Sequence, residues 1–284
     1  MRGILITNAF MHLASVDRLR NMFLSAADQL GIALCACGND RCMVLPRADF
    51  VLFYDKDIRL AQRFELSGMP VFNCARAIEV CDDKTLTYLC LERAGVRQID
   101  TLLCPKTFPG VSYGSAAFVE QAGELLGWPL VVKEGMGSLG QQVYLCENAA
   151  QVRARLAQTG ERQVLFQRFI ASSAGRDKRL FVVGDRVIAA IERRNFHGDF
   201  RANIENGGSP RAITPTKEEC ALALQAARAL GLDFAGVDLL DDAGGARICE
   251  VNSNAHFGGL YDATGVNAAE HILCHIRRRL CKDG

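Results

Sequence analysis

The chain has 284 residues, of which 49% are hydrophobic and 23% charged, and its formal net charge is +1. The length accommodates roughly two or three domains. The small net charge excludes the strong field that draws a protein to nucleic acid or to an anionic membrane. No apolar run approaches the roughly 20 residues of a membrane-spanning helix, and the N-terminal run is too short for a signal peptide. We therefore expect a cytoplasmic protein with no nucleic-acid or membrane partner.

The twelve cysteines are scattered along the chain, and none forms a CxxC pair. Most lie inside apolar runs such as Leu89-Cys90-Leu91. In a reducing compartment such residues behave as small core side chains. The sequence therefore predicts neither a structural zinc site nor a disulfide framework.

Strand and helix patterns alternate in the first third of the chain. Short apolar runs at Gly3–Thr7, Ile32–Cys37, Phe50–Tyr54 and Val71–Phe72 predict strands. Helical spacing predicts one helix that begins at Ser15 and a second over Ile58–Leu66. This alternation predicts a small parallel sheet with helices on its faces.

The pattern changes near residue 80. Asp82 is the expected cap of a helix that runs to about Ala94, and helical spacing predicts another helix from about Lys217 to Leu230. Two hairpins are predicted near the C-terminus, one turning at Gly184-Asp185 and one between Asp242 and Gly245. Further strands are expected over Leu130–Lys133 and Val143–Cys146.

A glycine-rich loop, Gly135 to Gly140, joins these last two strands and follows Lys133. Glycines let backbone N–H groups approach an anion closely, and Ser138 adds a hydroxyl donor. No Gly-Lys-Ser/Thr follows, so the loop is not a Walker A motif. It suggests a flap that covers phosphates. An ordinary hairpin loop is the alternative interpretation.

The second predicted hairpin carries three oxygen-bearing side chains, Asp238, Glu250 and Asn252. If the turn centres on Gly244, Asp238 and Glu250 face each other, and Asn252 points to the same side because side chains alternate along a strand. Two carboxylates this close repel each other unless a cation lies between them. Oxygen ligands suit magnesium. A solvent-facing hairpin with incidental acids is the alternative.

A set of cations follows the first hairpin, in the run that holds Arg193, Arg194, Arg201 and Asn203. Guanidinium groups match carboxylate and phosphate oxygens. Taken alone, this run also fits a solvated basic loop.

Eight motifs in this order resemble the ATP-grasp superfamily, in particular its RimK-like branch of carboxylate–amine (alpha-L-glutamate) ligases. The similarity covers about residues 80 to 270. The motifs are Asp83-Lys84, Val131-Val132-Lys133, Gly137-Ser138-Leu139-Gly140, Gln167-Arg168-Phe169-Ile170, Gly175 to Arg179, Gly198 to Asn203, Gly236 to Leu240, and Glu250-Val251-Asn252-Ser253.

The resemblance implies a mixed α/β ATP-grasp fold with an N-terminal Rossmann-like domain. We expect this domain over residues 1–80, a central subdomain with the flap over 81–166, and a C-terminal subdomain with the metal site over 167–284.

The resemblance also implies roles for individual residues. ATP would bind with its phosphates on Lys84 and Lys133, its adenine edge on the backbone at Arg168 and Phe169, and its ribose near Asp177. The implied nucleotide-binding set is Lys84, Lys133, Gly137, Ser138, Gly140, Gln167, Arg168, Phe169, Ile170, Asp177 and Arg179. Asp238, Glu250 and Asn252 would hold two Mg²⁺ ions, with Mn²⁺ as an alternative. Arg201 and Asn203 would face the reacting phosphoryl group, and Arg193 would help bind the substrate carboxylate.

Two departures from the family pattern stand out. The family often has glutamate in place of Arg168, and it often reads Asn-x-Ser/Thr-Pro-Gly where this chain has Asn252 to Phe257. The second segment would lie beside the acceptor pocket, so the substrate cannot be carried over from a relative.

The implied reaction joins a small-molecule or peptide carboxylate to an amino-acid-like amine through an acyl phosphate and releases ADP and phosphate. Four alternatives stay open: an ATP-grasp kinase, a thiol ligase, a ligase or macrocyclase for a ribosomal peptide, and a non-catalytic ATP-binding sensor. A homo-oligomer also stays open.

Overall fold

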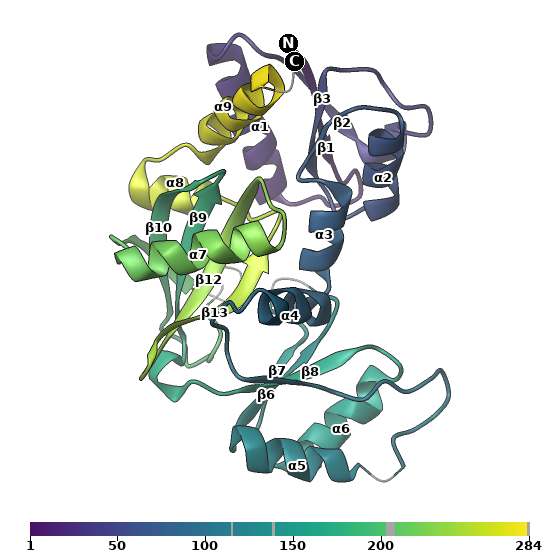
Figure 1. Cartoon of the computed structure of the whole chain (residues 1–284), viewed down its shortest axis with the longest axis vertical. Helices are drawn as coiled ribbons and strands as arrows, with labels where there is room; N and C mark the ends of the chain where they lie inside the picture. The colour runs from purple at the N-terminus through teal and green to yellow at the C-terminus, as the bar shows by residue number, and fades with distance from the viewer. Residues whose placement is uncertain (115, 138–139, 203–207, 283–284) are drawn as a thin grey trace.

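The structure is a computed structural model that describes residues 1–114, 116–137, 140–202 and 208–282. Strands form three sheets, in the orders β2-β1-β3-β4, β5-β8-β6-β7 and β11-β10-β9-β12-β13, with helices packed against them (Figure 1). The predicted mixture of α and β structure is confirmed. Within the described ranges, no helix is long and apolar enough to cross a membrane.

The N-terminal sheet is parallel throughout, as predicted. Its strands are β1 (Arg2–Thr7), β2 (Ala33–Gly38), β3 (Phe50–Tyr54) and β4 (Val71–Phe72), and its helices are α1 (Ala14–Gln29), α2 (Ile58–Leu66) and α3 (Ala75–Asp82), with a short 3₁₀ turn η1 (Asn39–Arg41) after β2. Because the strands are parallel, their carboxyl ends meet at one edge of the sheet.

Two predicted helix starts were wrong. Helix α1 begins after Leu13 rather than at Ser15, and Leu13 makes no side-chain cap. Helix α4 (Lys84–Arg93) is capped by Asp83, whose carboxylate accepts the backbone N–H groups of Thr85 and Leu86. Asp82 instead ends the separate helix α3. Adjacent aspartates offer equivalent caps in sequence, and only the backbone path selects one of them.

The central sheet is antiparallel, and helices pack against one face of it. Its strands are β5 (Thr101–Leu103), β6 (Leu130–Glu134), β7 (Val143–Cys146) and β8 (Val164–Arg168), and its helices are α5 (Ala117–Leu126) and α6 (Ala149–Thr159). Val119, Leu156 and Phe166 belong to its separate core. We placed a domain boundary after residue 166, and strand β8 spans that position. The division of the chain into three domains stays a prediction.

The C-terminal sheet contains both predicted hairpins. Its strands are β9 (Arg176–Val183), β10 (Arg186–Asn195), β11 (Gly208–Ala212), β12 (Phe234–Asp242) and β13 (Gly245–Asn252), preceded by the 3₁₀ turn η2 (Ala171–Ser173). Helix α7 (Lys217–Ala229) packs against one face. Helices α8 (Gly258–Thr264) and α9 (Ala268–Lys282) end the described chain beside α1.

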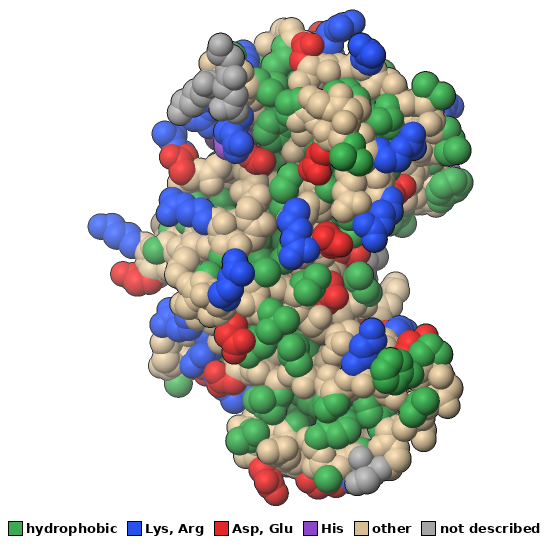
Figure 2. Space-filling view, turned by 45° about the vertical axis from the view of Figure 1, so that its right-hand side comes forward, with side chains coloured by type: hydrophobic (Ala, Val, Ile, Leu, Met, Phe, Trp, Pro, Cys, Tyr) green, Lys and Arg blue, Asp and Glu red, His purple; other side chains and the backbone are tan. Residues whose placement is uncertain are grey.

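One hydrophobic core joins the N-terminal and C-terminal sheets. Phe257 is fully buried, and its ring meets Phe23, Tyr54 and Phe181 at centroid distances of 5.3, 6.3 and 5.9 Å. Tyr54 also stacks on Phe234 at 5.7 Å and donates a hydrogen bond from its hydroxyl to the Ala255 carbonyl at 2.9 Å. The two sheets are therefore held in a defined relative position. The surface differs from this apolar core, because Lys and Arg side chains are interspersed with Asp and Glu on the face that Figure 2 shows.

We expect Phe257→Ala to lower the free energy of unfolding by about 3–5 kcal/mol, because it removes a buried ring and leaves a cavity between the two sheets. Chemical denaturation followed by fluorescence measures the change. Phe196→Ala is the matched control, because Phe196 is 74% exposed. Equal effects of the two substitutions would contradict a shared core.

Candidate active site

A cleft between the central and C-terminal sheets collects most of the predicted site residues. It encloses about 840 Å³, counting the part open to solvent. The predicted residues that line it are Lys84, Lys133, Gly137, Gly140, Gln167, Arg168, Phe169, Ile170, Asp177, Arg193, Arg201, Asp238 and Glu250. Arg179 and Asn252 line a second, adjoining pocket. Ser138 and Asn203 lie outside the described residues.

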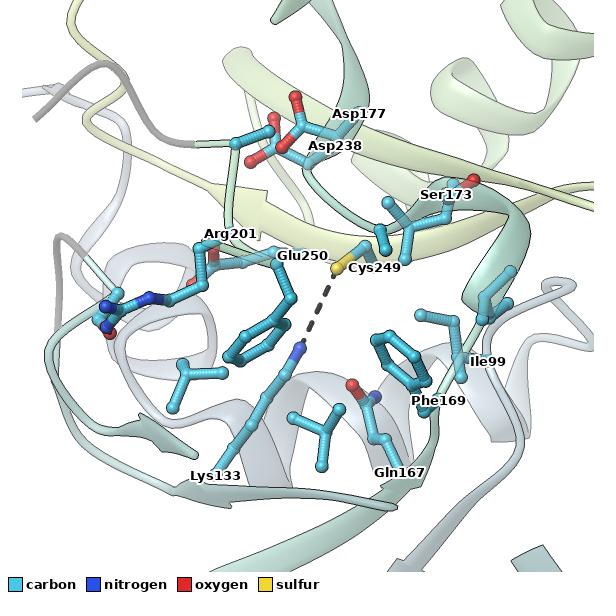
Figure 3. Close-up of a pocket in the computed structure, with 18 of the residues that line it drawn as sticks. Ile99, Lys133, Gln167, Phe169, Ser173, Asp177, Arg201, Asp238, Cys249 and Glu250 are labelled. Carbon is cyan, nitrogen blue, oxygen red and sulfur yellow. Dashed lines mark hydrogen bonds between the residues drawn. The ribbon is translucent and has the colours of Figure 1, made fainter. Parts of the chain in front are cut away.

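Two lysines reach into the cleft from different elements. Lys133 lies on β6, which is buried along its whole length, and its Nζ is 3.7 Å from the Cys249 sulfur (Figure 3). Lys84 is the first residue of α4, and its Nζ donates to the Gly137 carbonyl at 2.8 Å and lies 3.7 Å from Glu250 Oε1. Burial lowers the pKa of Lys84, and Lys133 adds to this while Glu250 opposes it.

The strand β8 ends at the cleft and continues into Phe169 and Ile170, which line it. The Gln167 side chain is buried and donates to the Thr101 hydroxyl at 2.9 Å. The Phe169 ring packs edge-on against Phe200 at 6.2 Å. Ile99, Phe169, Ile170 and Leu240 give this end of the cleft apolar walls.

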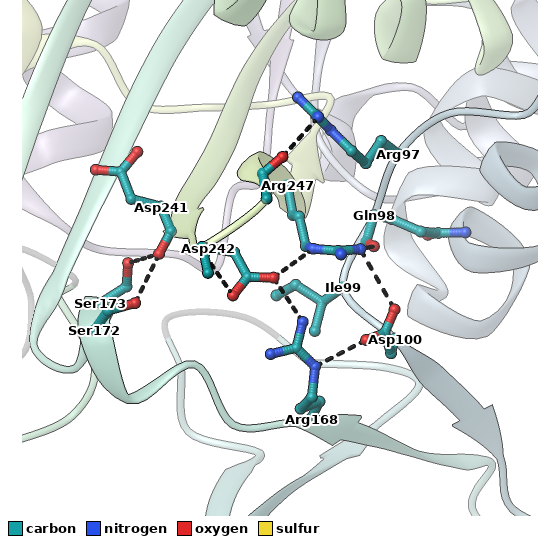
Figure 4. Close-up of polar contacts among 12 residues, drawn as sticks. Arg97, Gln98, Ile99, Asp100, Arg168, Ser172, Ser173, Asp241, Asp242 and Arg247 are labelled. Carbon is teal, nitrogen blue, oxygen red and sulfur yellow. Dashed lines mark hydrogen bonds and ion pairs between the residues drawn. The ribbon is translucent and has the colours of Figure 1, made fainter. Parts of the chain in front are cut away.

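The Arg168 side chain binds two acids from other elements. Its Nε donates to Asp100 at 2.8 Å and its Nη2 to Asp242 at 2.7 Å (Figure 4). Arg247 also binds Asp242, at 2.6 Å, and lies 3.4 Å from Asp100. The guanidinium thus ties the end of β8 to the β12–β13 hairpin.

A β-bulge places the two acids of this hairpin. Asp242 pairs with Gly245, which leaves Ala243-Gly244 as the turn, and Leu239 pairs with Ile248. The register then shifts, so that Asp238 pairs with Glu250 and Cys249 is the extra residue. The predicted pairing is confirmed, but the predicted turn centre at Gly244 was wrong. Without the bulge, Asp238 would face Cys249, since a regular ladder keeps the register that the turn sets.

Asp238 is only 2% exposed and is surrounded by donors. Arg179 binds it with two hydrogen bonds of 2.7 Å, and Arg193 Nη2 adds one of 3.0 Å. Asn252 Nδ2 lies 3.5 Å from the same carboxylate. Burial raises the pKa of Asp238, but the two arginines outweigh it and hold the pKa below its usual range.

Arg193 is also buried and bridges two aspartates. Its Nε and Nη2 bind Asp177 at 2.7 and 2.6 Å, and Nη2 is shared with Asp238. Although burial disfavours its charge, the two carboxylates raise the pKa of Arg193. For Asp177, burial dominates and raises the pKa despite Arg193.

These contacts change one step of the sequence argument. We expected the repulsion between Asp238 and Glu250 to require a metal ion. In the structure Arg179 and Arg193 neutralise Asp238, and Lys84 lies near Glu250. Among the residues described, no three Asp, Glu, His or Cys side chains form a metal-binding group. The candidate donors are therefore two acids and one amide.

The donor set still fits a hard cation. Each carboxylate oxygen offers about two lone-pair sites, and Asp238 Oδ1 accepts one bond, from Arg179, whereas Oδ2 accepts from Arg179, Arg193 and, at 3.5 Å, Asn252. Glu250 has a half-exposed side chain whose nearest cation, Lys84, is 3.7 Å away. Glu250 is thus the most available oxygen ligand, with Asn252 beside it.

Comparison with known proteins agrees with this geometry. A family model described as the RimK-like ATP-grasp domain matches residues 81–276. An uncharacterized protein of Mycoplasma pneumoniae, the MG012 homolog, is 33% identical over 279 residues, 94% of this chain and 96% of that protein. A probable alpha-L-glutamate ligase of Parasynechococcus marenigrum is 36% identical over 84% of this chain, which spans 49% of that relative.

The chain belongs to the RimK-like ATP-grasp family.

Solved structures show the same fold at low identity. A D-alanine–D-alanine ligase from Bacillus anthracis has a TM-score of 0.78 at 16% identity, with 100% of both chains covered. The ATP-grasp ligase PsnB, solved with a minimal precursor, Mg and ADP, has a TM-score of 0.70 at 16% identity, with 96% of both chains covered. The predicted ATP-grasp fold is confirmed. The family is one of carboxylate–amine ligases, and this ATP-grasp protein is a ligase that forms carbon–nitrogen bonds.

Arg201 connects the predicted flap to the following loop. Its Nη1 donates to the Gly140 carbonyl at 2.6 Å, and its Nε and Nη2 bind Asp199. The hydrogen bonds that Arg201 donates to the Asp199 carboxylate raise the pKa of Arg201. Its charge therefore lies in the ATP-grasp cleft, beside the end of the glycine-rich loop.

Sequence reasoning missed two parts of the site. Cys249 and Ile99 line the cleft, although neither carries a motif. The N-terminal sheet also contributes Thr7, Asn8 and Asp55 to the adjoining pocket. A signal for these last three residues was available, because Thr7 ends β1 and Asn8 and Asp55 directly follow β1 and β3, and parallel sheets place their ligand sites at the carboxyl ends of their strands.

We expect Arg168→Ala to leave the affinity for ATP unchanged within about threefold, because the guanidinium is already held by Asp100 and Asp242, and to lower the free energy of unfolding by about 1 kcal/mol. Calorimetry and chemical denaturation measure the two quantities. Arg186→Ala, at a side chain that is 74% exposed, is the control. A tenfold or larger loss of ATP affinity would show that the Arg168 side chain contacts the nucleotide.

Proposed function

We propose that the protein binds ATP in the cleft and uses it to join a carboxylate to an amine through an acyl phosphate. One observation carries this proposal. Two lysines from separate elements and the acid Glu250 meet in one cleft, where Lys84 Nζ is 3.7 Å from Glu250. This arrangement suits phosphate groups accompanied by a divalent cation.

The nucleotide would lie along the cleft. The apolar end formed by Ile99, Phe169 and Leu240 suits the adenine ring, whose edge would meet the backbone after Arg168. Asp177 would lie near the ribose. The phosphates would reach Lys84 and Lys133 under the glycine-rich loop, with Ser138 as a further donor.

Two Mg²⁺ ions would be held at the hairpin by Glu250, Asn252 and the remaining acceptor site of Asp238. When bound, they would neutralise charge on the phosphates. Arg179 and Arg193 keep Asp238 ionised and in place. Arg201 and Asn203 would stabilise the transferring phosphoryl group from the side of the flap.

The reaction would proceed in two steps. A carboxylate oxygen attacks the γ-phosphorus of ATP, the bond to the bridging oxygen breaks, and ADP leaves. The amine then attacks the carbonyl carbon of the acyl phosphate, loses a proton, and expels phosphate. The chain would supply no covalent nucleophile. It positions the reactants and excludes water from the acyl phosphate. Arg193 Nε and Nη2 bind aspartates, so Nη1 would face the substrate carboxylate.

We expect Glu250→Gln to lower turnover by about 100-fold or more, because a carboxylate charge is lost where a divalent cation must bind. The assay measures ADP release and, with hydroxylamine as the amine, hydroxamate formation from a panel of carboxylates. Glu270→Gln is the control, because Glu270 is exposed on α9. Hydroxamate formation separates a ligase from a kinase. Wild-type turnover by Glu250→Gln would refute the metal assignment.

We expect ATP binding to take up a proton at alkaline pH. The pKa of Lys84 is lowered in the free protein, and a bound phosphate would raise it again, so a neutral amine must gain a proton when ATP binds. Calorimetry in two buffers of different ionisation enthalpy measures this uptake. Lys84→Arg should abolish it, since a guanidinium stays charged. Equal uptake by the variant would show that Lys84 does not meet the phosphates.

A further inference from the structure

A second pocket adjoins the cleft where the N-terminal sheet meets the β12–β13 hairpin. It encloses about 1290 Å³, counting the part open to solvent. Arg193 and Glu250 line both the cleft and this pocket. A molecule in the second pocket therefore lies next to the proposed phosphate end of the cleft, where a substrate carboxylate must be activated.

The lysine and arginine side chains of this pocket are already neutralised. Within the described part of the chain, Lys56 pairs with Asp82, Arg179 with Asp238, and Arg193 with Asp177 and Asp238. A substrate with a second carboxylate, such as glutamate, would meet no unpaired lysine or arginine here. It would instead meet Glu250 and Asp55.

Asp55 directly follows strand β3 and carries a carboxylate without a cationic partner in the described residues. Its hydrogen-bond donors among the described residues are neutral and include the Lys56 backbone N–H at 2.7 Å and Asn8 Nδ2 at 3.2 Å. Burial raises the pKa of this carboxyl, and these hydrogen bonds oppose the rise. A buried carboxylate in this setting favours a ligand that brings a positive charge.

Asn254, which contacts the Asp55 backbone, adds an acceptor that is unsatisfied. Its Nδ2 donates to the Asp55 carbonyl at 2.7 Å, which fixes the orientation of the amide. Its Oδ1 is buried and has no hydrogen-bond partner in the described structure. A buried acceptor without a donor costs about 1–3 kcal/mol. An ammonium group has three donors and could satisfy both Asp55 and Asn254.

Another part of the pocket lining is apolar. It is formed by Met11, Leu13, Val16 and Leu19, from the segment after β1 and from helix α1. Met11 and Leu13 in this wall are 48% and 41% exposed. Large apolar side chains grouped at the rim of a pocket are typical of a ligand-binding surface.

We infer that this pocket binds an apolar amino acid, holds its ammonium group on Asp55 and Asn254, packs its side chain against the Met11–Leu19 wall, and presents its carboxylate for activation. The inference rests on the proposed function and names its carboxylate substrate. The ammonium is a recognition group and not the nucleophile, because an attacking amine must be deprotonated. The second substrate supplies that amine.

The test uses hydroxylamine in place of the amine, so that hydroxamate formation reports only on the activated carboxylate. With ATP and Mg²⁺, the wild-type protein is given leucine of either configuration, glutamate, or 4-methylpentanoate, which is leucine without its amino group. We expect kcat/KM for leucine of one configuration to exceed that for the other two carboxylates by about 10- to 100-fold.

Asp55→Asn keeps the shape of the side chain and removes its charge. It should lose most of the preference for leucine over 4-methylpentanoate, through KM, while its ATP affinity stays unchanged. Met11→Glu should weaken leucine binding without making glutamate a substrate. Asp28→Asn, at an exposed position on α1, is the matched control and should behave as wild type.

The outcomes separate this inference from the proposed function. A preference for glutamate, equal use of 4-methylpentanoate, a retained preference in Asp55→Asn, or no hydroxamate from any of these carboxylates while ATP still binds would overturn the inference. Failure of the wild-type protein to bind ATP with Mg²⁺ would overturn the proposed function itself.

Discussion

The site depends on the charge of Asp238, which is almost completely buried on strand β12. A buried carboxylate stays ionised only if cations compensate for its lost hydration. The register of the sheet places these cations beside Asp238. Asp238 pairs with Arg179 on β9, and Arg193 on β10 pairs with Asp177. A slip of one residue would send these side chains to the opposite face and leave a buried charge without a partner. The register and the charge network therefore stabilise each other.

This network leaves the two hairpin acids, Asp238 and Glu250, in different environments. Asp238 has most of its acceptor sites filled by arginines, while Glu250, directly opposite, remains available to a ligand. The bulge at Cys249 makes this division, because it moves Glu250 into the position facing Asp238 and turns the Cys249 sulfur toward Lys133. Asp238 thus organises the strands, and Glu250 is the more available acid for a ligand.

The N-terminal sheet takes part in the site because it shares a core with the C-terminal sheet. Tyr54 stacks on Phe234 and binds the Ala255 carbonyl, so the residue after it, Asp55, is held beside the segment that follows the hairpin. The substrate pocket that we propose is thus built from both ends of the chain. Changes in the loop after β1 could alter its apolar wall without disturbing the nucleotide cleft.

The sequence by itself determined the elements and the motif residues. Its strand patterns, two hairpins and ordered motifs predicted the sheets and most of the cleft lining, because these signals lie within a few residues of each other. Only the tertiary structure decided where Arg168 points, since its partner Asp242 is 74 residues away. It also decided that Asp55 enters a pocket with Asn254, and that arginines neutralise Asp238. Such contacts depend on how separate sheets pack, and no local period or spacing encodes that packing.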